Sequence, residues 1–518
     1  MRICSKIRQL KVIGLVVDPL PWVFLNSLLG DLSKNPRRDF TLTSIPSSFG
    51  KRSFTFRDAL QGFLLHDDLP FASMLDHDWI HEVFRKHKSL FGGIYHTTIV
   101  LWAFLSQVLR DGKEASCQSA VSRISAFLIR AGRKPPTADT GDYCRARAKL
   151  AELAVKEVCI GVGSQAQSKA NPKWLWKNRN AYLVDGFTFQ MPDTPENQKA
   201  YPQHTAQKPG LGFPIARVTG LISLATGALV NAAFGRYKGK GTGETALFKQ
   251  LFGSLKAGDI VVADRHYCSY WLICALMSMG VDICFRKHQA RHTDFRKGRR
   301  LGKYDHVVSW KKSVRPEWMS KKEYASLPRE ITLREIRYVI DEPGRKQEPF
   351  VVATTMLELE GETGATRDEL ADLYGYRWNI ELDIRSIKSF MNLSHVRCKS
   401  PEMVHREVWV TLLAYNLIRT TIALAANLCG KRPRQISFVS ACQYVLASWQ
   451  EAHQIEKRVL LAHYCRAMLM AIGQCIVGNR PGRFEPRVVK LRRDQYKKMM
   501  KPRNELRKRL ERHDNSFE

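Results

Sequence analysis

The stretch AYLVDGFTF, residues 181–189, marks a change in the sequence from a helix-forming to a strand-forming pattern. It is a short apolar run rich in aromatic residues, and Asp185 and Gly186 interrupt it. A run of this length and composition is typical of a buried strand. Three later runs have the same character: ARVTGLISLATGALVNAAFG (216–235), DIVVADRHY (259–267) and VDICFRK (281–287). We therefore expect these segments to form a β-sheet.

Helix-forming segments alternate with the predicted strands. TGETALFKQLFGSL (242–255) and YWLICALMSM (270–279) flank the strand that ends at Asp264. Gly220 and the dipeptide Thr226–Gly227 suit a hairpin between the second and third of these four runs. Strands that alternate with helices indicate an α/β or mixed-sheet domain, so the predicted fold class is α/β (α+β).

The composition of the chain is strongly basic. Its 518 residues include 82 Lys and Arg against 49 Asp and Glu, a formal charge of +33. Dispersed cations favour a phosphate backbone as partner, because their binding releases condensed counterions. An anionic membrane is the weaker alternative, since the basic residues do not cluster beside an apolar anchor. The early apolar run LKVIGLVV (10–17) is too short to span a bilayer, so we expect a cytoplasmic protein that binds nucleic acid.

The regions on either side of the predicted sheet are helical in pattern, whereas residues 287–350 are basic and contain strand-like pieces. The expected organisation is a peripheral segment (1–53), a helical N-terminal domain (54–175), a core domain (176–430) with a β-rich insertion (287–350), and a basic helical C-terminal region (431–518). The N-terminal helices suit either DNA binding or a scaffold role.

The cysteine pattern argues against a zinc site or a disulfide framework. Twelve cysteines are scattered from Cys4 to Cys475, without a CxxC pair or a Cys/His cluster at zinc-ligand spacing. Buried reduced thiols are the default interpretation, and they fit a reducing compartment. Any bound metal would therefore have oxygen ligands.

Two carboxylates stand at the ends of predicted strands. Asp185 closes the apolar run YLV, and Asp264 closes the run DIVVA. Open α/β sheets hold their ligands at strand ends, so these side chains would approach a common point. Either residue alone is as well explained as a turn or capping residue.

A third carboxylate lies on the predicted helix TRDELADLYGYRWNIELDIRSIKSFM (366–391). Thr366 and Glu369 have the spacing of a capping box, which predicts where the helix begins. At about 100° per residue, four polar residues fall in one narrow sector beside an apolar stripe: Tyr374, Arg377, Glu381 and Lys388.

The apolar stripe would pack on the sheet and aim Glu381 at the cleft of the two Asp residues, while Asp383 points away. The alternative is a surface helix in which Arg377 and Glu381 form an ordinary ion pair four residues apart. Periodicity alone leaves both interpretations open.

Metal-assisted phosphoryl chemistry favours the first interpretation. Asp185, Asp264 and Glu381 would hold two divalent cations, one activating the attacking oxygen and one stabilising the leaving 3′-oxygen. Mg²⁺ prefers such hard oxygen ligands, and Mn²⁺ would substitute for it. Arg377 and Lys388 would contact phosphate oxygens.

The helix residues carry a resemblance to a known family. Their order and spacing match in full the signature of the insertion-sequence-4 family of DDE transposases: Tyr374, two residues, Arg377, three residues, Glu381, six residues, Lys388. The motifs DG at Asp185 and DRHY at Asp264 are similar to that family's first two acidic motifs. The resemblance covers roughly residues 182–427, with His266 at a position where the family often has glycine.

This resemblance implies an RNase H-like catalytic core with a β-rich insertion, flanked by helical domains. It also implies a bacterial, nucleoid-associated cut-and-paste transposase that cleaves its ends through a hairpin and inserts the element elsewhere. The implied partners are double-stranded DNA, as terminal inverted repeats and target, and further copies of the chain. Tyr374, Arg377 and Lys388 would hold the terminal phosphates.

Trp310, in the strand-like segment VVSWKK, is the candidate for stacking on a flipped base, although core packing is the commoner role of tryptophan. Two other interpretations of the whole chain stay open. One is a catalytically silent DNA-binding descendant, and the other is an RNase H-like nuclease without strand transfer.

Overall fold

The computed structural model describes residues 77–130, 132–316, 319–339, 349–361, 363–452, 455, 458–478 and 499–511. The predicted peripheral segment 1–53, the predicted helix FRDALQGFLL (56–65) and part of the basic C-terminal stretch lie outside these ranges. All described residues belong to the unit that begins at Ser53. The predicted domain borders at residues 53, 175 and 430 stay predictions.

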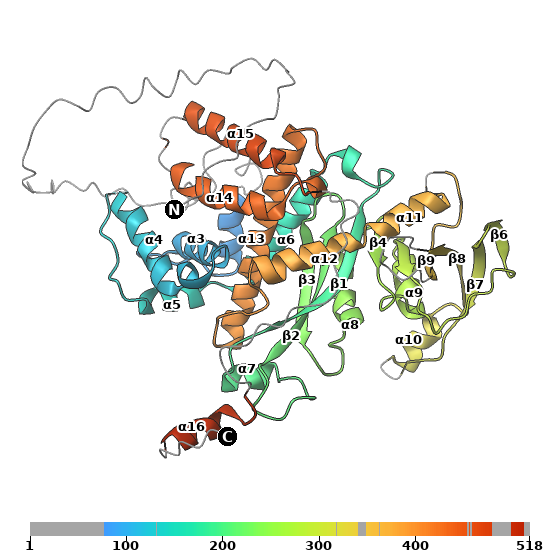
Figure 1. The fold of residues 1–518 in the computed structure, drawn as a ribbon, viewed down its shortest axis with the longest axis horizontal. Helices are drawn as coiled ribbons and strands as arrows, with labels where there is room; N and C mark the ends of the chain where they lie inside the picture. The colour runs from blue at the N-terminus through green and yellow to red at the C-terminus, as the bar shows by residue number, and fades with distance from the viewer. Residues whose placement is uncertain are drawn as a thin grey trace, which may run out of the picture. The chain divides into compact units, whose positions relative to one another are not determined.

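In the described part of the chain, nine strands form one sheet in the order β3-β2-β1-β4-β5-β9-β8-β7-β6 (Figure 1). The strands are β1 (Ala181–Gln190), β2 (Ile215–Ser223), β3 (Leu229–Arg236), β4 (Ile260–Ala263), β5 (Asp282–Arg286), β6 (Arg299–Gly302), β7 (Asp305–Lys311), β8 (Glu330–Val339) and β9 (Pro349–Thr354). β1, β2 and β3 are antiparallel, whereas β1, β4 and β5 run parallel. This half of the sheet has the strand order and directions of an RNase H-like core.

The turn between β2 and β3 confirms a hairpin at Thr226–Gly227, but it lies inside the second apolar run, and Gly220 belongs to β2 because its backbone pairs with both β1 and β3. Gly227 has a φ of +76°, a left-handed conformation that glycine adopts without a side-chain penalty. A Cβ on Gly227 would also lie 3.1 Å from the Arg419 side chain. The turn therefore needs glycine both for its backbone and for the close approach of Arg419.

The predicted insertion is mostly β-structure, as expected. β6, β7 and β8 follow β5 in the chain, and β9 pairs with both β8 and β5, so the insertion extends the core sheet. Its interior is charged: Arg334 donates to Asp305 at 2.6 and 2.8 Å, and Lys287 lies 3.1 Å from Glu335. All four side chains are buried.

Helices surround the sheet. Those before it are α2 (His77–Lys86), α3 (Thr97–Val108), α4 (Cys117–Arg130), α5 (Gly141–Ala148) and α6 (Glu152–Ser168), with the short helices η2 (Gly112–Ala115) and η3 (Pro172–Trp174). Those between the strands are α7 (Pro195–Ala200), α8 (Glu244–Lys249), η4 (Phe252–Ser254), α9 (Tyr270–Ser278) and α10 (Lys321–Ser326). After the sheet come α11 (Arg367–Gly375), α12 (Trp378–Arg385), η5 (Ser386–Phe390), α13 (Pro401–Leu428), η6 (Pro433–Gln435), α14 (Phe438–Ala452), α15 (Arg458–Gln474) and α16 (Arg503–Glu511).

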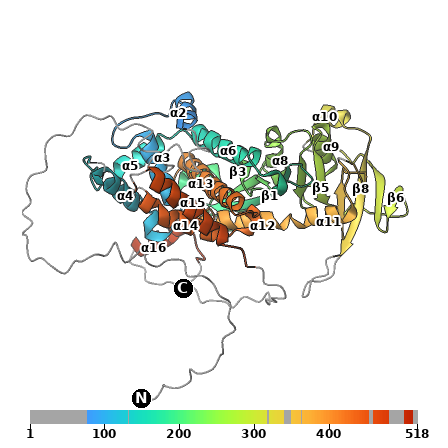
Figure 2. The ribbon, with the colours of Figure 1, turned by 90° about the horizontal axis from the view of Figure 1, so that it is seen from above.

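Alternation along β1 divides the interior into two cores. Tyr182 and Val184 pack with α8 and α9 on one face, whereas Leu183 and Phe187 pack with α11, α12 and α13 on the other (Figure 2). Successive side chains of a strand point to opposite faces, so the odd-numbered residues of β1 face α12. This parity decides which side of the sheet Asp185 faces.

Helix α13 is the centre of the helical part, and it contacts α3, α6, α14 and α15. Among the described residues it is the one helix long and apolar enough to cross a membrane, but 94% of its apolar window is buried inside the protein. Its hydrophobicity is therefore that of a core helix.

Candidate active site

Asp185 and Asp264 lie side by side on the face of the sheet that α12 covers. β1 and β4 run parallel in a register that places the two residues at equivalent positions. Asp264 lies directly beyond the end of β4, as predicted, whereas Asp185 lies within β1 and not at its end, because pairing with β2 continues the strand to Gln190. Adjacent strands are about 4.8 Å apart. Leu183 and Val262, two residues earlier in each chain segment, pack in the same core as α12. The two predicted carboxylates therefore do meet.

Two neighbouring carboxylates disfavour each other's ionised form. Burial raises the pKa of Asp185 to about 6, and the neighbouring charges of Asp264 and Glu244 act in the same direction. The Gly186 N–H, which donates to Asp185 Oδ1 at 2.8 Å, and the charge of Arg377 oppose this rise. Asp264 accepts the N–H of His266 at 2.8 Å. In the described part of the chain neither Asp belongs to an ion pair.

The predicted helix 366–391 begins as expected but is not uninterrupted. Thr366 and Glu369 form the predicted capping box, with N–H to side-chain distances of 3.2 and 2.8 Å. Tyr376 and Arg377 form a turn between α11 and α12, and residues 386–390 form a π-helical turn. The apolar stripe holds across these breaks, because its members Leu373, Ile380 and Ile387 are fully buried. The predicted polar face therefore survives the interruptions.

Glu381 lies on α12 with its side chain 45% exposed, and it is paired with Arg377. Arg377 Nη2 donates to Glu381 Oε1 at 2.9 Å, and the guanidinium packs over the Trp378 ring at 4.4 Å. The ion pair that the sequence left open as an alternative is thus present. This ion pair is compatible with a place for the helix beside the two Asp residues, since the charge of Arg377 also acts on Asp185.

Tyr374 and Lys388 border the same edge of the sheet. Tyr374 is buried against Phe350, with ring centroids 5.4 Å apart; burial raises its pKa, and the charge of Asp264 adds to the rise. Lys388 Nζ lies 6.0 Å from the centroid of Phe187, two residues beyond Asp185 on β1. Tyr374 and Arg377 are thus within electrostatic reach of the Asp pair, Glu381 contacts Arg377, and Lys388 lies beside the strand that carries Asp185.

Trp310 is placed apart from these residues, inside the insertion. It is 4% exposed, its Nε1 donates to Glu335 Oε1 at 2.6 Å, and Arg291 covers its ring at 4.2 Å. A side chain packed in this way matches the core-packing interpretation. Its role in base stacking stays a prediction.

Two further carboxylates lie near the site. Glu244, which the sequence did not single out, packs over Gly186 from the opposite face, where a Cβ on Gly186 would lie 2.4 Å from its side chain. Asp383, predicted to point away from Glu381, is fully buried and is paired with Arg419 and Arg434. These partners had no local signal, because they come from distant segments.

The donor set of the site consists of carboxylate oxygens, which suit a hard divalent cation. Within the described ranges no group of three or more His, Cys, Asp or Glu residues is close enough together to hold a metal ion. Asp185 and Asp264 would supply two ligands, whereas Glu381 is turned towards Arg377. A three-carboxylate site therefore requires Glu381 to exchange Arg377 for the cation.

Comparisons with known proteins show the family of the chain. The family model described as the transposase DDE domain matches residues 176–417. Transposase InsG for insertion sequence element IS4, from Escherichia coli (strain K12), is 31% identical over 352 residues, which are 67% of this chain and 75% of that protein. The chain belongs to the insertion-sequence-4 family of DDE transposases.

Two further proteins are similar to the chain, one over a short segment and one over most of its length. The putative transposase InsZ of the same E. coli strain is 26% identical over 119 residues, 22% of this chain and 39% of that protein. A solved piggyBac transposase in a synaptic complex with hairpin DNA covers 83% of this chain and 87% of its own, at 12% identity and a TM-score of 0.39.

Membership of the family decides the general function. The transposase is an enzyme that cleaves and transfers DNA strands, and a cut-and-paste reaction is consistent with its family. DNA is its substrate, and the DDE domain implies dependence on a divalent metal. The expected α/β fold with an RNase H-like core is confirmed.

Proposed function

We propose that Asp185, Asp264 and Glu381 hold two Mg²⁺ ions, for which Mn²⁺ substitutes, and that these carboxylates form the catalytic site of the transposase. The observation that supports this most strongly is the unpaired, partly buried Asp185–Asp264 couple, in which burial raises the pKa of Asp185 to about 6. Two neighbouring carboxylates without a basic partner are costly unless a cation binds between them.

When bound, the metal ions supply Lewis-acid activation of the attacking oxygen and stabilise the leaving 3′-oxygen. Arg377 would exchange Glu381 for a DNA phosphate, to which its planar fork can donate two hydrogen bonds. Tyr374 and Lys388 would hold neighbouring phosphates, Lys388 as a point charge. Terminal inverted repeats, target DNA and a second copy of the chain are the partners of this proposal, at the bacterial nucleoid.

Single substitutions of the three carboxylates test this proposal. Asp185→Asn, Asp264→Asn and Glu381→Gln should each abolish Mg²⁺-dependent cleavage and Mn²⁺ binding, while binding of the element's end DNA in EDTA stays near the wild-type level. Glu244→Gln is the matched control, because Glu244 is close to Asp185 but lies on the opposite face of the sheet. Cleavage that survives all three substitutions would refute the assignment.

The joining of cleaved ends distinguishes the transposase from a nuclease. Incubation of pre-cleaved ends with a supercoiled plasmid should produce covalent strand-transfer products, and gel analysis of the cleaved flank reports whether a hairpin forms. Cleavage without any strand transfer would favour the nuclease interpretation.

A further inference from the structure

We propose that a cleft between the N-terminal helices and the segment Met391–Cys398 binds a phosphate group of the DNA backbone, through Arg147 and Arg397. The proposal rests on DNA as the substrate of the transposase, and it does not depend on which residues hold the metal. It adds a second point of DNA contact outside the candidate active site.

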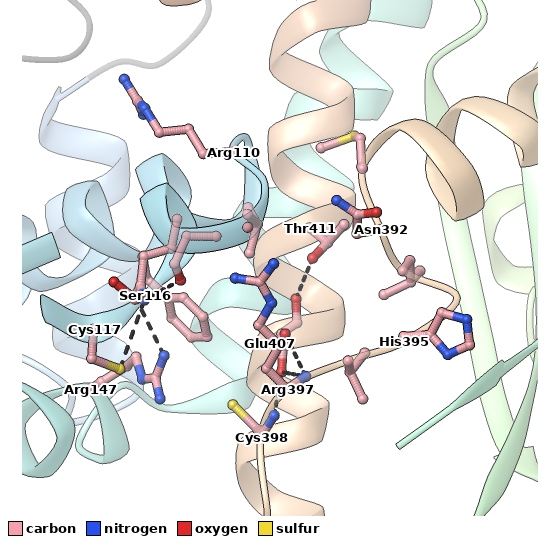
Figure 3. Close-up of a pocket in the computed structure, with 18 residues that line it drawn as sticks. Arg110, Ser116, Cys117, Arg147, Asn392, His395, Arg397, Cys398, Glu407 and Thr411 are labelled. Carbon is pink, nitrogen blue, oxygen red and sulfur yellow. Dashed lines mark hydrogen bonds between the residues drawn. The ribbon is translucent and has the colours of Figure 1, made fainter. Parts of the chain in front are cut away.

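The cleft has a volume of about 500 Å³, within the ~300–1,000 Å³ that is usual for ligand sites. Figure 3 shows its walls: α3, α4 and α5 on one side, α13 behind, and the segment that carries Asn392, His395 and Arg397 opposite. Apolar side chains form part of the lining, including Phe104, Leu393 and Val396. Such a space accommodates a phosphate together with part of its nucleotide.

Arg147 is a partly buried cation that forms no ion pair among the described residues, although the charge of Glu407, in the same lining, acts on it. Its guanidinium packs over the Phe104 ring at 4.6 Å and near the Tyr143 ring at 5.7 Å, and its one side-chain hydrogen bond is a long one, 3.4 Å, to Gln107. Among the described residues no carboxylate forms an ion pair with it, and its buried Nε has no hydrogen-bond partner. A buried guanidinium stays charged and needs an anion, so its position beside a cleft indicates an anionic ligand.

The carboxylate in the lining is already engaged. Glu407 accepts the backbone N–H of Arg397 at 3.0 Å and that of Cys398 at 2.8 Å. These two bonds also fix the segment that carries Arg397 against α13. Arg110 also lines the cleft, but its Nη1 donates to the Ser106 carbonyl at 2.9 Å and its guanidinium pairs with Glu114 at 3.7 Å. The lining therefore holds two arginines that form no ion pair among the described residues, Arg147 and Arg397, and one carboxylate, Glu407.

The position of the cleft along the sheet relates it to the candidate active site. Gln190, at the end of β1, exchanges backbone hydrogen bonds with Ser394 and Val396, at 2.9 and 3.1 Å. Gln190 is five residues beyond Asp185, which corresponds to about 17 Å of strand. Since a DNA strand advances about 3.4 Å per nucleotide along the duplex axis, the cleft would meet a phosphate about five nucleotides from the scissile one.

Salt-dependent DNA binding tests the charge of the site. The full-length protein, with EDTA present, would be titrated with a duplex that bears the element's terminal repeat. Arg147→Gln and Arg397→Gln should each weaken binding about tenfold and reduce the slope of log K against log salt by about one. Arg145→Gln is the matched control, because Arg145 lies on the same helix, is 71% exposed and pairs with Asp142 instead. It should leave the slope unchanged.

Neutral phosphates locate the contact on the DNA. In a scan of single methylphosphonates, one position about five nucleotides from the cleavage site should weaken wild-type binding as much as Arg397→Gln does, and should have no further effect on that variant. Arg397 is exposed, so its substitution tests the site even if Arg147→Gln does not fold.

Three results would overturn the proposal: wild-type salt slopes in both variants, an equal loss in Arg145→Gln, or additive effects of Arg397→Gln and every methylphosphonate. Thermal stabilisation of the wild type by millimolar inorganic phosphate, without any change in DNA binding of the variants, would assign the cleft to a free anion instead. All these measurements are made without metal, so failure of the proposed metal site would change only the expected position of the sensitive phosphate along the DNA, and not the salt slopes or the loss of its effect in Arg397→Gln.

Discussion

Helix α12 carries two carboxylates two residues apart in opposite environments. Glu381 is 45% exposed and is paired with Arg377, four residues earlier. Asp383 is fully buried, and its two oxygens accept hydrogen bonds from Arg419 at 2.5 Å and Arg434 at 2.6 Å. A carboxylate that two fixed cations neutralise has a structural role, whereas one whose partner is on its own helix can exchange that partner for a ligand.

The contacts of Asp383 also fix where Glu381 stands. Arg434 donates to the carbonyls of Ser223 and Leu224 at 2.8 and 3.0 Å, so Asp383 ties α12 to the β2–β3 hairpin. Arg419 belongs to α13, so the same carboxylate ties α12 to the central helix. The ion pairs of Asp383 thereby fix the position of α12 and, with it, the position of Glu381.

The largest difference between the two carboxylates should be in activity. We expect Glu381→Gln to slow Mg²⁺-dependent cleavage by about 10⁴-fold or more, because metal stabilisation of the transition state is worth several kcal/mol. Its free energy of unfolding should change by less than about 0.5 kcal/mol, since the side chain is half-exposed. Single-turnover cleavage and urea denaturation measure the two quantities. A large loss of stability in Glu381→Gln would mean that Glu381, like Asp383, has a structural role.

Asp383→Asn should give the opposite pattern. Removal of one partner of a buried ion network leaves the remaining charges uncompensated, which costs about 3–5 kcal/mol of unfolding free energy. Urea denaturation measures the loss. Asp372→Asn is the control, because Asp372 is exposed on α11, and it should cost less than about 0.5 kcal/mol. Equal stabilities of the two variants would contradict a structural role for Asp383.

Asp185→Asn should stabilise the metal-free protein at neutral pH while it abolishes cleavage. The pKa of Asp185 is raised from 3.8 to about 6 in the folded state, so folding favours its protonated form. The folded protein therefore loses stability as the pH rises from about 4 to about 6, by about 2 kcal/mol from this group. Denaturation in EDTA should show the gain of the variant above pH ~6 and its disappearance towards pH ~4. If Asp185→Asn did not raise the free energy of unfolding at neutral pH, the pKa of Asp185 would not be raised by burial and by its carboxylate neighbours.

The smallest effect on the fold is expected for Arg377→Lys. An ion pair between residues four apart on a helix is worth only about 0.3–0.5 kcal/mol, and Lys preserves the charge. The planar fork is lost, however, so binding of end DNA should weaken about three- to tenfold. Fluorescence anisotropy with labelled end DNA checks this, and Arg385→Lys, an exposed residue of the same helix, is the control. An unchanged affinity for end DNA would mean that Arg377 pairs with Glu381 and does not contact the DNA.

Local pattern was sufficient for several parts of the fold. Thr366 and Glu369 are three residues apart and cap the helix by contacts within one turn, and the hairpin at Gly227 depends on a single backbone conformation. The apolar runs that lead to Asp185 and Asp264 were recognisable as strands because buried parallel strands are short apolar runs, but β1 continues past Asp185 to Gln190. Each of these features is determined by neighbours in the sequence.

The sequence by itself therefore determined the family, the strands, the helix face with Glu381, and the basic character that suits DNA. Only the tertiary structure decided that Asp185 and Asp264 occupy equivalent positions on adjacent strands, that Asp383 is neutralised by Arg419 and Arg434, and that Arg147 forms no ion pair among the described residues. The physical reason is that the ion pairs of a charged side chain depend on which residues lie near it in the folded protein. A side chain's partners come from segments up to hundreds of residues away, and no local periodicity records which cations reach which carboxylates.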